Sequence, residues 1–150
     1  MSNTFLRKAT LQDVDLIFEW ANDEDDRRFS FNTEKIVYED HCKWYQRKID
    51  SEDTDIYILL SDDIPIGQCR LDFDDEGALI SYFIDKRFRK KGYGKLLLRM
   101  IADVTKSEHP SIKRLNAQVK AENIGSKKVF RALGYEEKEC GNINEYSLAL

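Results

Sequence analysis

An apolar strand that runs directly into a basic, glycine-containing helix start is the feature that most constrains this chain. The stretch ALISYFI (residues 78–84) is almost continuously apolar, which is typical of a buried strand. The stretch RFRKKGYGKLLLRM (residues 87–100) follows it and sets Gly92 and Gly94 among cations before a helical apolar pattern begins. Free N–H groups and the dipole at a helix N-terminus favour an anion, and glycines let the anion approach the backbone. The segment therefore predicts a cradle for a pyrophosphate or a similarly compact anion.

The overall charge of the chain limits what this basic segment can serve. The 150 residues carry a formal net charge of −4, so the cations are a local feature. Binding of nucleic acid or of an anionic membrane surface needs a broad basic face. No apolar run approaches the roughly 20 residues of a membrane span, and the N-terminal segment lacks a signal-peptide core. We therefore expect neither a nucleic-acid nor a membrane partner, and a cytoplasmic location.

The cysteines and histidines argue against metal and disulfide chemistry. The three cysteines, Cys42, Cys69 and Cys140, are far apart and odd in number, which gives neither a disulfide framework nor paired metal ligands. The two histidines, His41 and His109, are also far apart. We expect no metal site. His41 shares a predicted helix face with Trp44, where it is either a packing partner of that ring or a substrate contact.

Periodicity and turn signals predict a single mixed α/β domain over residues 1–150. Thr10 followed by Asp13 is a helix N-cap signal, and the acidic and basic residues 23–28 read as a polar loop. The expected order is β-α-α-β-β-β-α-β-α-β-β. The strands are expected at 5–9, 55–61, 66–73, 78–84, 112–119, 135–140 and 144–150, and the helices at 11–23, 38–49, 92–106 and 123–134.

Two motifs in this order resemble a known family. The hexapeptide RKKGYG resembles the R/Q-x-x-G-x-G/A signature of the GNAT superfamily of acyl-CoA N-acyltransferases, whereas the nucleotide-binding P-loop and dinucleotide fingerprints are absent. The stretch VKAENIGSKKVFRALGY (residues 119–135) resembles the downstream N-x-x-S-x-x-x-[YF]-x-x-x-G-[FY] pattern of the same superfamily. The residues that match it are Asn123, Ser126, Phe130, Gly134 and Tyr135.

The resemblance implies a mixed, mostly antiparallel central sheet flanked by helices. The sheet would splay between the strand at Leu79–Ile84 and the strand at Ile112–Val119, and acetyl-CoA, the co-substrate, would enter the splay. Its pyrophosphate would lie on the N–H groups of Lys91 to Lys95, and its pantetheine arm would pair with the first of these strands. The cofactor-binding residues implied are Tyr82, Phe83, Ile84, Arg89, Lys90, Lys91, Gly92, Tyr93, Gly94, Lys95, Asn123 and Ser126.

The same resemblance implies an N-acetyltransferase, although two positions depart from the pattern. An N–H near Phe83 would polarise the thioester carbonyl. Phe130 occupies the place of a tyrosine acid that many relatives carry, and Gln118 the place of a glutamate base that some carry. The remaining candidates for the base are Glu145, Ser81 and Asp72, or a chain of water molecules. A catalytically silent CoA-binding module is the alternative that these departures leave open.

The N-terminal half resembles GNAT proteins of bacterial surface-sugar biosynthesis. Three matching stretches lie at Asp13 to Asp23, Arg27 to Phe31 and Glu39 to Trp44. Relatives of pseudaminic-acid-type pathways acetylate a nucleotide-linked amino sugar, so the resemblance implies a small-molecule amine acceptor. Its binding residues would be Arg27, Phe29 and Trp44, unless the rings only pack and Arg27 and Arg28 only pair with neighbouring carboxylates. N-terminal acetylation of a ribosomal protein is the other acceptor considered, and the chain is expected to be a monomer or a homodimer.

Overall fold

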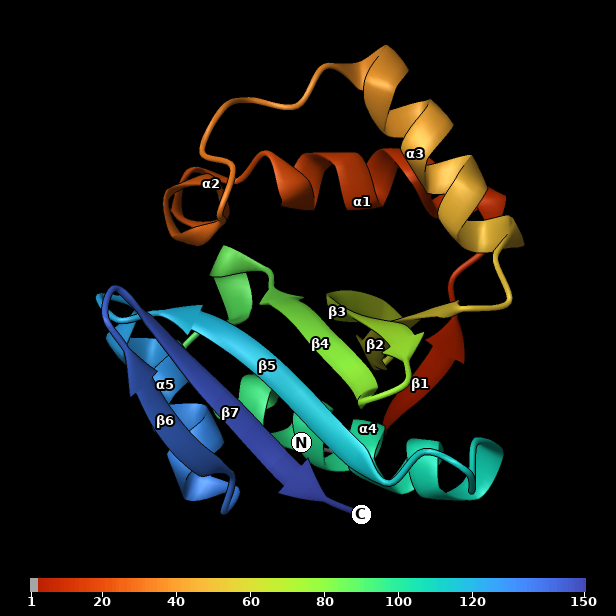
Figure 1. Cartoon of the computed structure of the whole chain (residues 1–150). Coiled ribbons are helices and arrows are strands. Elements are labelled where there is room, and N and C mark those ends of the chain that lie inside the picture. The colour runs from red at the N-terminus through yellow and green to blue at the C-terminus, as the bar shows by residue number, and fades with distance from the viewer. Residues whose placement is uncertain (1–2) are drawn as a thin grey trace.

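A seven-stranded sheet lies between two layers of helices in the computed structural model, which describes residues 3–150 (Figure 1). Helices α1, α2 and α3 lie on one face of the sheet, and α4 and α5 lie on the other. The strand order is β1-β2-β3-β4-β5-β7-β6. The strands are β1 (Thr4–Lys8), β2 (Thr54–Ser61), β3 (Ile64–Asp74), β4 (Gly77–Ile84), β5 (Arg114–Lys120), β6 (Glu136–Cys140) and β7 (Ile143–Ala149). The helices are α1 (Val14–Ala21), α2 (Glu24–Phe29), α3 (Tyr38–Asp50), α4 (Tyr93–Glu108) and α5 (Ile124–Ala132), with single 3₁₀ turns η1 (Leu11–Asp13) and η2 (Lys86–Phe88).

Strands β2 and β4 are almost continuously apolar because each contributes side chains to two cores. Successive side chains of a strand point to opposite faces. On β4, Ile80 and Ile84 enter the core beneath α4 and α5, while Phe83 enters the core beneath α1 and α3. On β2, Leu59 enters the core beneath α4 and α5, and Ile58 enters the core beneath α1 and α3. A strand buried on both faces needs apolar residues at consecutive positions, which is the pattern that the sequence shows.

The splay expected between β4 and β5 is confirmed. These two strands are parallel and pair only at Ala78 with Leu115 and at Leu79 with Asn116. Beyond these pairs the strands diverge, as Figure 1 shows. The remaining neighbours in the sheet are antiparallel. The sheet is therefore mixed and mostly antiparallel, and it opens at the C-terminal end of β4.

The expected element order is confirmed except at residues 23–28, where the prediction of a loop is wrong. These residues form the short helix α2. The Asp23 side chain caps it by accepting the N–H groups of Asp25 and Asp26, at 3.0 and 3.1 Å. Acidic residues fill the first turn and Arg27 and Arg28 the last, which suits the helix dipole. A six-residue helix without apolar periodicity gives no signal that differs from a charged loop.

The N-cap signal at Thr10 is confirmed. The Gln12 N–H donates to the Thr10 hydroxyl at 3.3 Å, and the Asp13 carboxylate accepts the Thr10 N–H at 2.8 Å. Arg7 of β1 adds two hydrogen bonds to the same carboxylate, each of 2.8 Å. The start of the α1 layer is thereby attached to the edge of the sheet.

Two features of residues 3–150 bear on membrane and metal partners. No helix in this part of the chain is both long and apolar enough to cross a membrane. The same residues hold no group of three or more His, Cys, Asp or Glu side chains placed to bind a metal ion.

Candidate active site

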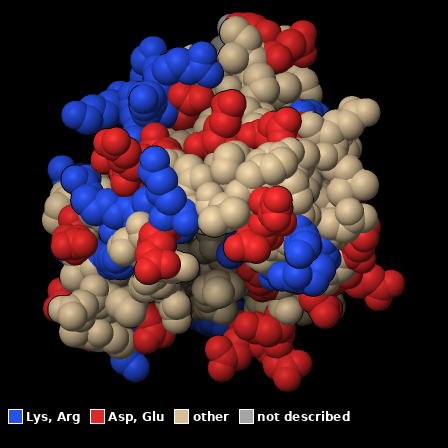
Figure 2. Space-filling view, turned by 90° about the horizontal axis from the view of Figure 1, so that it is seen from above, with Lys and Arg blue, Asp and Glu red and all other residues tan. Residues whose placement is uncertain are grey.

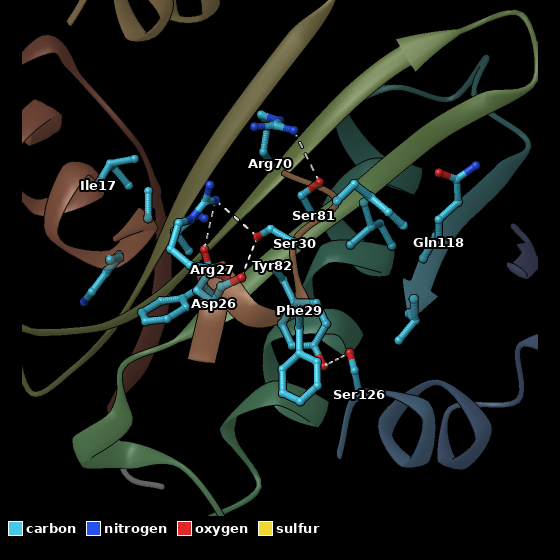
Figure 3. A pocket seen from close by; sticks show the side chains of 18 of the residues that line it. Ile17, Asp26, Arg27, Phe29, Ser30, Arg70, Ser81, Tyr82, Gln118 and Ser126 are labelled. Carbon is cyan, nitrogen blue, oxygen red and sulfur yellow. Dashed lines mark hydrogen bonds and ion pairs between the residues drawn. The ribbon is translucent and has the colours of Figure 1, made fainter. Parts of the chain in front are cut away.

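A pocket of about 520 Å³ connects the splay of the sheet with the α1–α3 layer (Figure 3). Strands β4 and β5 contribute Ser81, Tyr82 and Gln118, and the start of α5 contributes Ser126. Helices α1, α2 and α3, on the other side of the pocket, contribute both aromatic and charged side chains. These are Trp20 from α1, Asp26, Arg27 and Phe29 from α2, and Asp40, His41 and Trp44 from α3.

The residues predicted to lie in the splay are brought together. The Tyr82 and Ser126 hydroxyls share a hydrogen bond of 2.8 Å, drawn in Figure 3. The Ser126 N–H donates to the Asn123 side chain at 3.2 Å, so Asn123 is the N-cap of α5. Burial of the Tyr82 phenol raises its pKa to about 12. The phenol therefore stays protonated at neutral pH and forms part of the lining between β4 and α5.

The Phe83 N–H, which was expected to polarise the thioester carbonyl, points away from the splay. This expectation is wrong for Phe83, and the N–H that faces the splay belongs to a neighbouring residue. The Phe83 carbonyl lies against Gly67 of β3, and the Asp85 N–H donates to Ile66 of β3 at 2.8 Å. Because the N–H and C=O groups of successive strand residues face alternate edges, Tyr82 and Ile84 face the splay. The Ile84 carbonyl confirms this direction, since it accepts the Arg89 Nε–H at 2.9 Å. Tyr82 is therefore the residue whose N–H faces the open edge.

The glycine-containing segment forms the helix start that the sequence predicts. Gly92 is the N-cap of α4, with a left-handed φ of 85°, a conformation that glycine adopts without a steric penalty. The first hydrogen bond of the helix runs from the Leu96 N–H to the Gly92 carbonyl, at 3.1 Å. The N–H groups of residues 93–95 precede that bond and have no helical acceptor. Lys90 and Lys91 are exposed beside them.

Arg89, predicted to bind the cofactor, lies instead between β4 and α2. Its guanidinium donates to Asp23 at 3.1 Å and to Asp25 at 2.9 Å, and it lies over the Phe83 ring at 5.1 Å. With its third hydrogen bond to Ile84, the side chain holds the N-terminus of α2 against the end of β4. We therefore do not retain Arg89 as a ligand of the pyrophosphate.

All three residues predicted to bind the acceptor line the pocket. Arg27 donates to the Asn32 carbonyl at 2.9 Å and to the Ser30 hydroxyl at 3.1 Å. Its Nε is buried and finds no acceptor within residues 3–150. Trp44 lies beneath the Arg70 guanidinium at 5.2 Å, and Arg28 lies over the Phe29 ring at 4.5 Å.

The alternative, that Arg27 and Arg28 only pair with neighbouring carboxylates, fits the contacts of Arg28 but not those of Arg27. Arg28 is exposed and pairs with Asp25 at 3.3 Å. Arg27 has a distant pairing with Asp26, at 3.7 Å, and most of its hydrogen bonds go to the segment after α2. Its guanidinium therefore shapes that segment as well as the pocket wall.

Two of the predicted base candidates lie outside the pocket or are otherwise engaged. Glu145 is exposed on β7, beside Gln118 in the sheet register, and accepts a hydrogen bond from Cys140 Sγ at 3.2 Å. Asp72 is held by Lys48 and Arg70, at 3.0 and 2.8 Å. Neither carboxylate is in the pocket lining that residues 3–150 provide. We therefore do not retain Glu145 as a base.

Ser81 does line the pocket, as predicted. Its hydroxyl accepts a long hydrogen bond from Arg70, at 3.4 Å (Figure 3). A neutral hydroxyl beside a guanidinium is a poor proton acceptor, so Ser81 is better placed to orient a ligand than to act as a base.

A carboxylate that the sequence did not single out does line the pocket. Asp26 of α2 lies there beside Arg27, and burial raises its pKa to about 6 although the Arg27 charge opposes this shift. In the sequence it is one of four consecutive acidic residues, 23–26. The capping position of Asp23, three residues earlier, was the only signal that could have placed Asp26 on a helix.

The surface around the pocket mixes both signs of charge. Figure 2 shows Lys and Arg side chains gathered mainly on the left of the face seen from above, with Asp and Glu among them and around a hollow of uncharged surface. This arrangement agrees with a local basic region on a chain of net charge −4.

Comparisons with known proteins agree with the fold. The model of the acetyltransferase (GNAT) domain family matches residues 3–136. The uncharacterized N-acetyltransferase YfmK of Bacillus subtilis is 26% identical over 124 residues, which are 82% of this chain and 78% of that protein.

Solved structures show the same fold at low sequence identity. RimL, a ribosomal L7/L12 alpha-N-protein acetyltransferase in complex with coenzyme A, superposes with a TM-score of 0.86 at 15% identity, over 100% of this chain and 96% of that one. Spermidine N-acetyltransferase from Vibrio cholerae, in complex with CoA and spermine, gives 0.87 at 15% identity, over 99% and 96%. With its family match, its splayed sheet and its glycine-capped helix start, this chain belongs to the GNAT acetyltransferase family.

Proposed function

We propose that this GNAT acetyltransferase transfers an acetyl group from acetyl-CoA to a primary amine of a small molecule, and that the acceptor is a nucleotide-linked amino sugar. The observation that carries the proposal is one continuous pocket. It joins the open edge of β4 to a chamber whose walls are aromatic rings and charges of both signs. Acetyl donor and amine can meet only where two such compartments are connected.

The donor compartment fits the shape and charge of acetyl-CoA. The free N–H groups of residues 93–95, with the exposed Lys90 and Lys91, form a site for a pyrophosphate. The unpaired edge of β4 offers backbone groups to an extended amide-containing arm, as an added strand would. The Tyr82 N–H lies on that edge, where it can donate to an acyl oxygen. Bound acetyl-CoA supplies a thioester, whose carbonyl carbon is open to attack by an amine.

The acceptor compartment favours a ring-shaped ligand with balanced charge. Phe29 and Trp44 provide aromatic surface, on which a sugar or a base can stack. The buried Arg27 Nε needs an acceptor, because an unsatisfied buried donor costs about 1–3 kcal/mol. A hydroxyl or phosphate oxygen of the ligand would satisfy it.

The charges of the lining do not select a polycation. The lining holds two carboxylates, Asp26 and Asp40, and two guanidiniums, Arg27 and Arg70. The carboxylates would attract a polyamine, and the guanidiniums would repel it. This balance favours an amino sugar over a polyamine. N-terminal acetylation of a ribosomal protein is the second candidate, and the superposition with RimL favours it at the level of the fold alone.

A steady-state thiol-release assay with a panel of amines tests the proposal. The panel holds nucleotide-linked 4-amino sugars, spermidine and N-terminal peptides of ribosomal proteins, with acetyl-CoA saturating. We expect the highest kcat/KM with an amino sugar. A peptide or polyamine as the best substrate would replace the acceptor assignment and leave the donor assignment intact. Coenzyme A binding without turnover of any amine would favour a silent binding module.

Two further expectations accompany this proposal. Three free cysteines are suited to a reducing compartment, so we expect the protein to act in the cytoplasm. A monomer or a homodimer is the expected state, which sedimentation analysis measures directly.

A further inference from the structure

We propose that Asp26 is the general base of the transfer: its carboxylate binds the ammonium group of the acceptor and removes a proton from it. The inference rests on the proposed function in one respect, that the acceptor is an amine. It adds a catalytic residue at a position of α2 that lies between the matched stretches Asp13 to Asp23 and Arg27 to Phe31.

The position of Asp26 in the pocket is the first support. Asp26 and Tyr82 line the same pocket, one on the α1–α3 layer and one on the open strand edge (Figure 3). An amine bound to the carboxylate would therefore face the strand along which the acyl donor is proposed to lie. The carboxylates predicted from the sequence, Glu145 and Asp72, lie outside that lining.

The second support is the anchoring of α2, which makes the position of Asp26 reproducible. Arg89 donates hydrogen bonds to the N-cap Asp23 and to Asp25 of α2, and to the Ile84 carbonyl on β4, all within 3.1 Å. The Ser30 hydroxyl donates to the Asp26 carbonyl at 2.5 Å and holds the other end of the short helix. The base is thus attached to the same strand end that faces the acyl donor, as a positioned catalytic group requires.

The charges around Asp26 allow it to accept a proton near neutral pH. The Arg27 Nη2 lies 3.7 Å from the Asp26 carboxylate. The negative charge of Asp23, at the start of α2, raises the pKa of Asp26, and the positive charge of Arg89, in the segment after β4, lowers it. Across the pocket lie Asp40, His41 and Arg70. Burial outweighs the two nearby guanidiniums and raises the pKa to about 6. The carboxylate is therefore ionised at pH 7 yet more basic than an ordinary aspartate, which suits general base catalysis.

His41 is another titratable group of the pocket lining, and its contacts indicate a structural role. Its Nε2 lies 2.9 Å from the Val14 carbonyl, which can only accept, so Nε2 carries the hydrogen. The ring is buried beside Phe18 and Tyr45, with centroids 5.2 and 5.8 Å away. Burial lowers the pKa of His41, which disfavours a cationic imidazole.

Asp26 takes one proton from the ammonium nitrogen, which frees the nitrogen lone pair. That pair forms the C–N bond to the acyl carbon while the C–S bond breaks, and the bonding pair of the C–S bond leaves with sulfur. The nitrogen loses its second proton to the sulfur, and Asp26 returns its proton to solvent. The products are an amide, a thiol and one released proton.

Asp26→Asn is the test, because it keeps the shape of the side chain and removes its basicity. With an amine that the wild type acetylates, we expect kcat to fall about 100-fold or more at pH 7. The acid limb of the kcat/KM profile near pH 6 should disappear, and the residual rate should rise with pH as free amine accumulates. The Kd for coenzyme A, measured by calorimetry on the protein alone, should stay within twofold. Glu24→Gln, an exposed change on the same helix, is the matched control and should leave all three quantities unchanged.

A second measurement keeps the test decisive if Asp26→Asn does not fold. Carbon-13 NMR of the wild-type protein without substrates should show the assigned Asp26 carboxyl titrating near pH 6. A titration complete below pH 5, or an unchanged acid limb in a folded Asp26→Asn variant, overturns the role of Asp26. If the wild type acetylates no amine of the panel, the proposed function fails, and the NMR titration still reports on Asp26 separately.

Discussion

Gly92 meets two demands at a single residue. Its φ of 85° turns the chain into α4, and its lack of a side chain leaves the N–H groups of the first turn open. Gly92→Glu should abolish measurable coenzyme A binding in calorimetry, because it adds bulk and negative charge where the pyrophosphate is proposed to lie. Gly92→Ala is the control for backbone strain, which costs about 1–3 kcal/mol at such a φ. It should weaken binding far less. Unchanged affinity in a folded Gly92→Glu protein would show that the anion binds elsewhere.

Phe130 is a buried packing residue at the base of the splay. Its ring is 1% exposed and lies among three tyrosines, edge-on to Tyr82 and Tyr135 and stacked on Tyr146 at 5.0 Å. The ring fills the core at the base of the splay while one part of it reaches the pocket. The side chain therefore packs, and it carries no hydroxyl that could protonate a leaving thiolate.

At the scale of elements, the junction between β4 and β5 depends on one glycine. Gly77 has a φ of 128°, and a Cβ there would collide with the Arg114 carbonyl on β5. Gly77→Ala should destabilise the protein by about 3 kcal/mol, because both the backbone conformation and the close approach are lost. Urea unfolding followed by circular dichroism measures the change.

Gly125, in the first turn of α5, is the matched control for that substitution. A Cβ at this position would meet no atom within 4 Å. Gly125→Ala should stabilise the protein by about 0.5–1 kcal/mol, since alanine favours the helix and restricts the unfolded chain. Equal effects of the two substitutions would contradict the tight β4–β5 junction.

At the scale of the whole molecule, several aspartates tie distant elements together and make stability depend on pH. Asp85 accepts hydrogen bonds from Arg87 and from the buried Trp20 Nε1, the latter at 3.0 Å. These donors overcome burial and lower its pKa to about 2. The pKa values of Asp13, Asp55 and Asp72 are also lowered, each by cationic partners that oppose burial.

Because the folded pKa of Asp85 lies below its unfolded value, its contribution to stability is present above about pH 4. It is lost as the pH falls toward 2. The free energy of unfolding, measured by tryptophan fluorescence in urea, should therefore decline through this window, with about 2 kcal/mol attributable to Asp85. Asp85→Asn should flatten the decline, and Asp103→Asn, an exposed change on α4, should not. An identical decline in Asp85→Asn would assign the acid sensitivity to the other aspartates.

The element order, the Thr10 cap and the glycine-capped start of α4 were predictable from the sequence because they depend on local patterns. Apolar periodicity, a capping side chain and a residue able to adopt positive φ all act within a few positions of one another. The splay between β4 and β5 was foreseen through the two motifs, which stand in fixed register with these strands. The pocket-lining positions of Tyr82, Asn123 and Ser126 followed from the same register.

Only the tertiary structure decided the partner of Arg89, the direction of the Phe83 backbone and the place of Asp26. Arg89 and Asp23 are 66 positions apart, and their ion pair exists because α2 packs on the end of β4. The register of β4 with β3 decides toward which edge of the strand the Phe83 N–H and C=O groups point. Hydrophobic periodicity predicts which face of the sheet a side chain occupies, and it does not predict the direction of these backbone groups. Asp26 has the same side chain as its neighbours Asp23 and Asp25 and differs from them only in what surrounds it. The free energy of burying a charge arises from contacts across the fold, which no local pattern encodes.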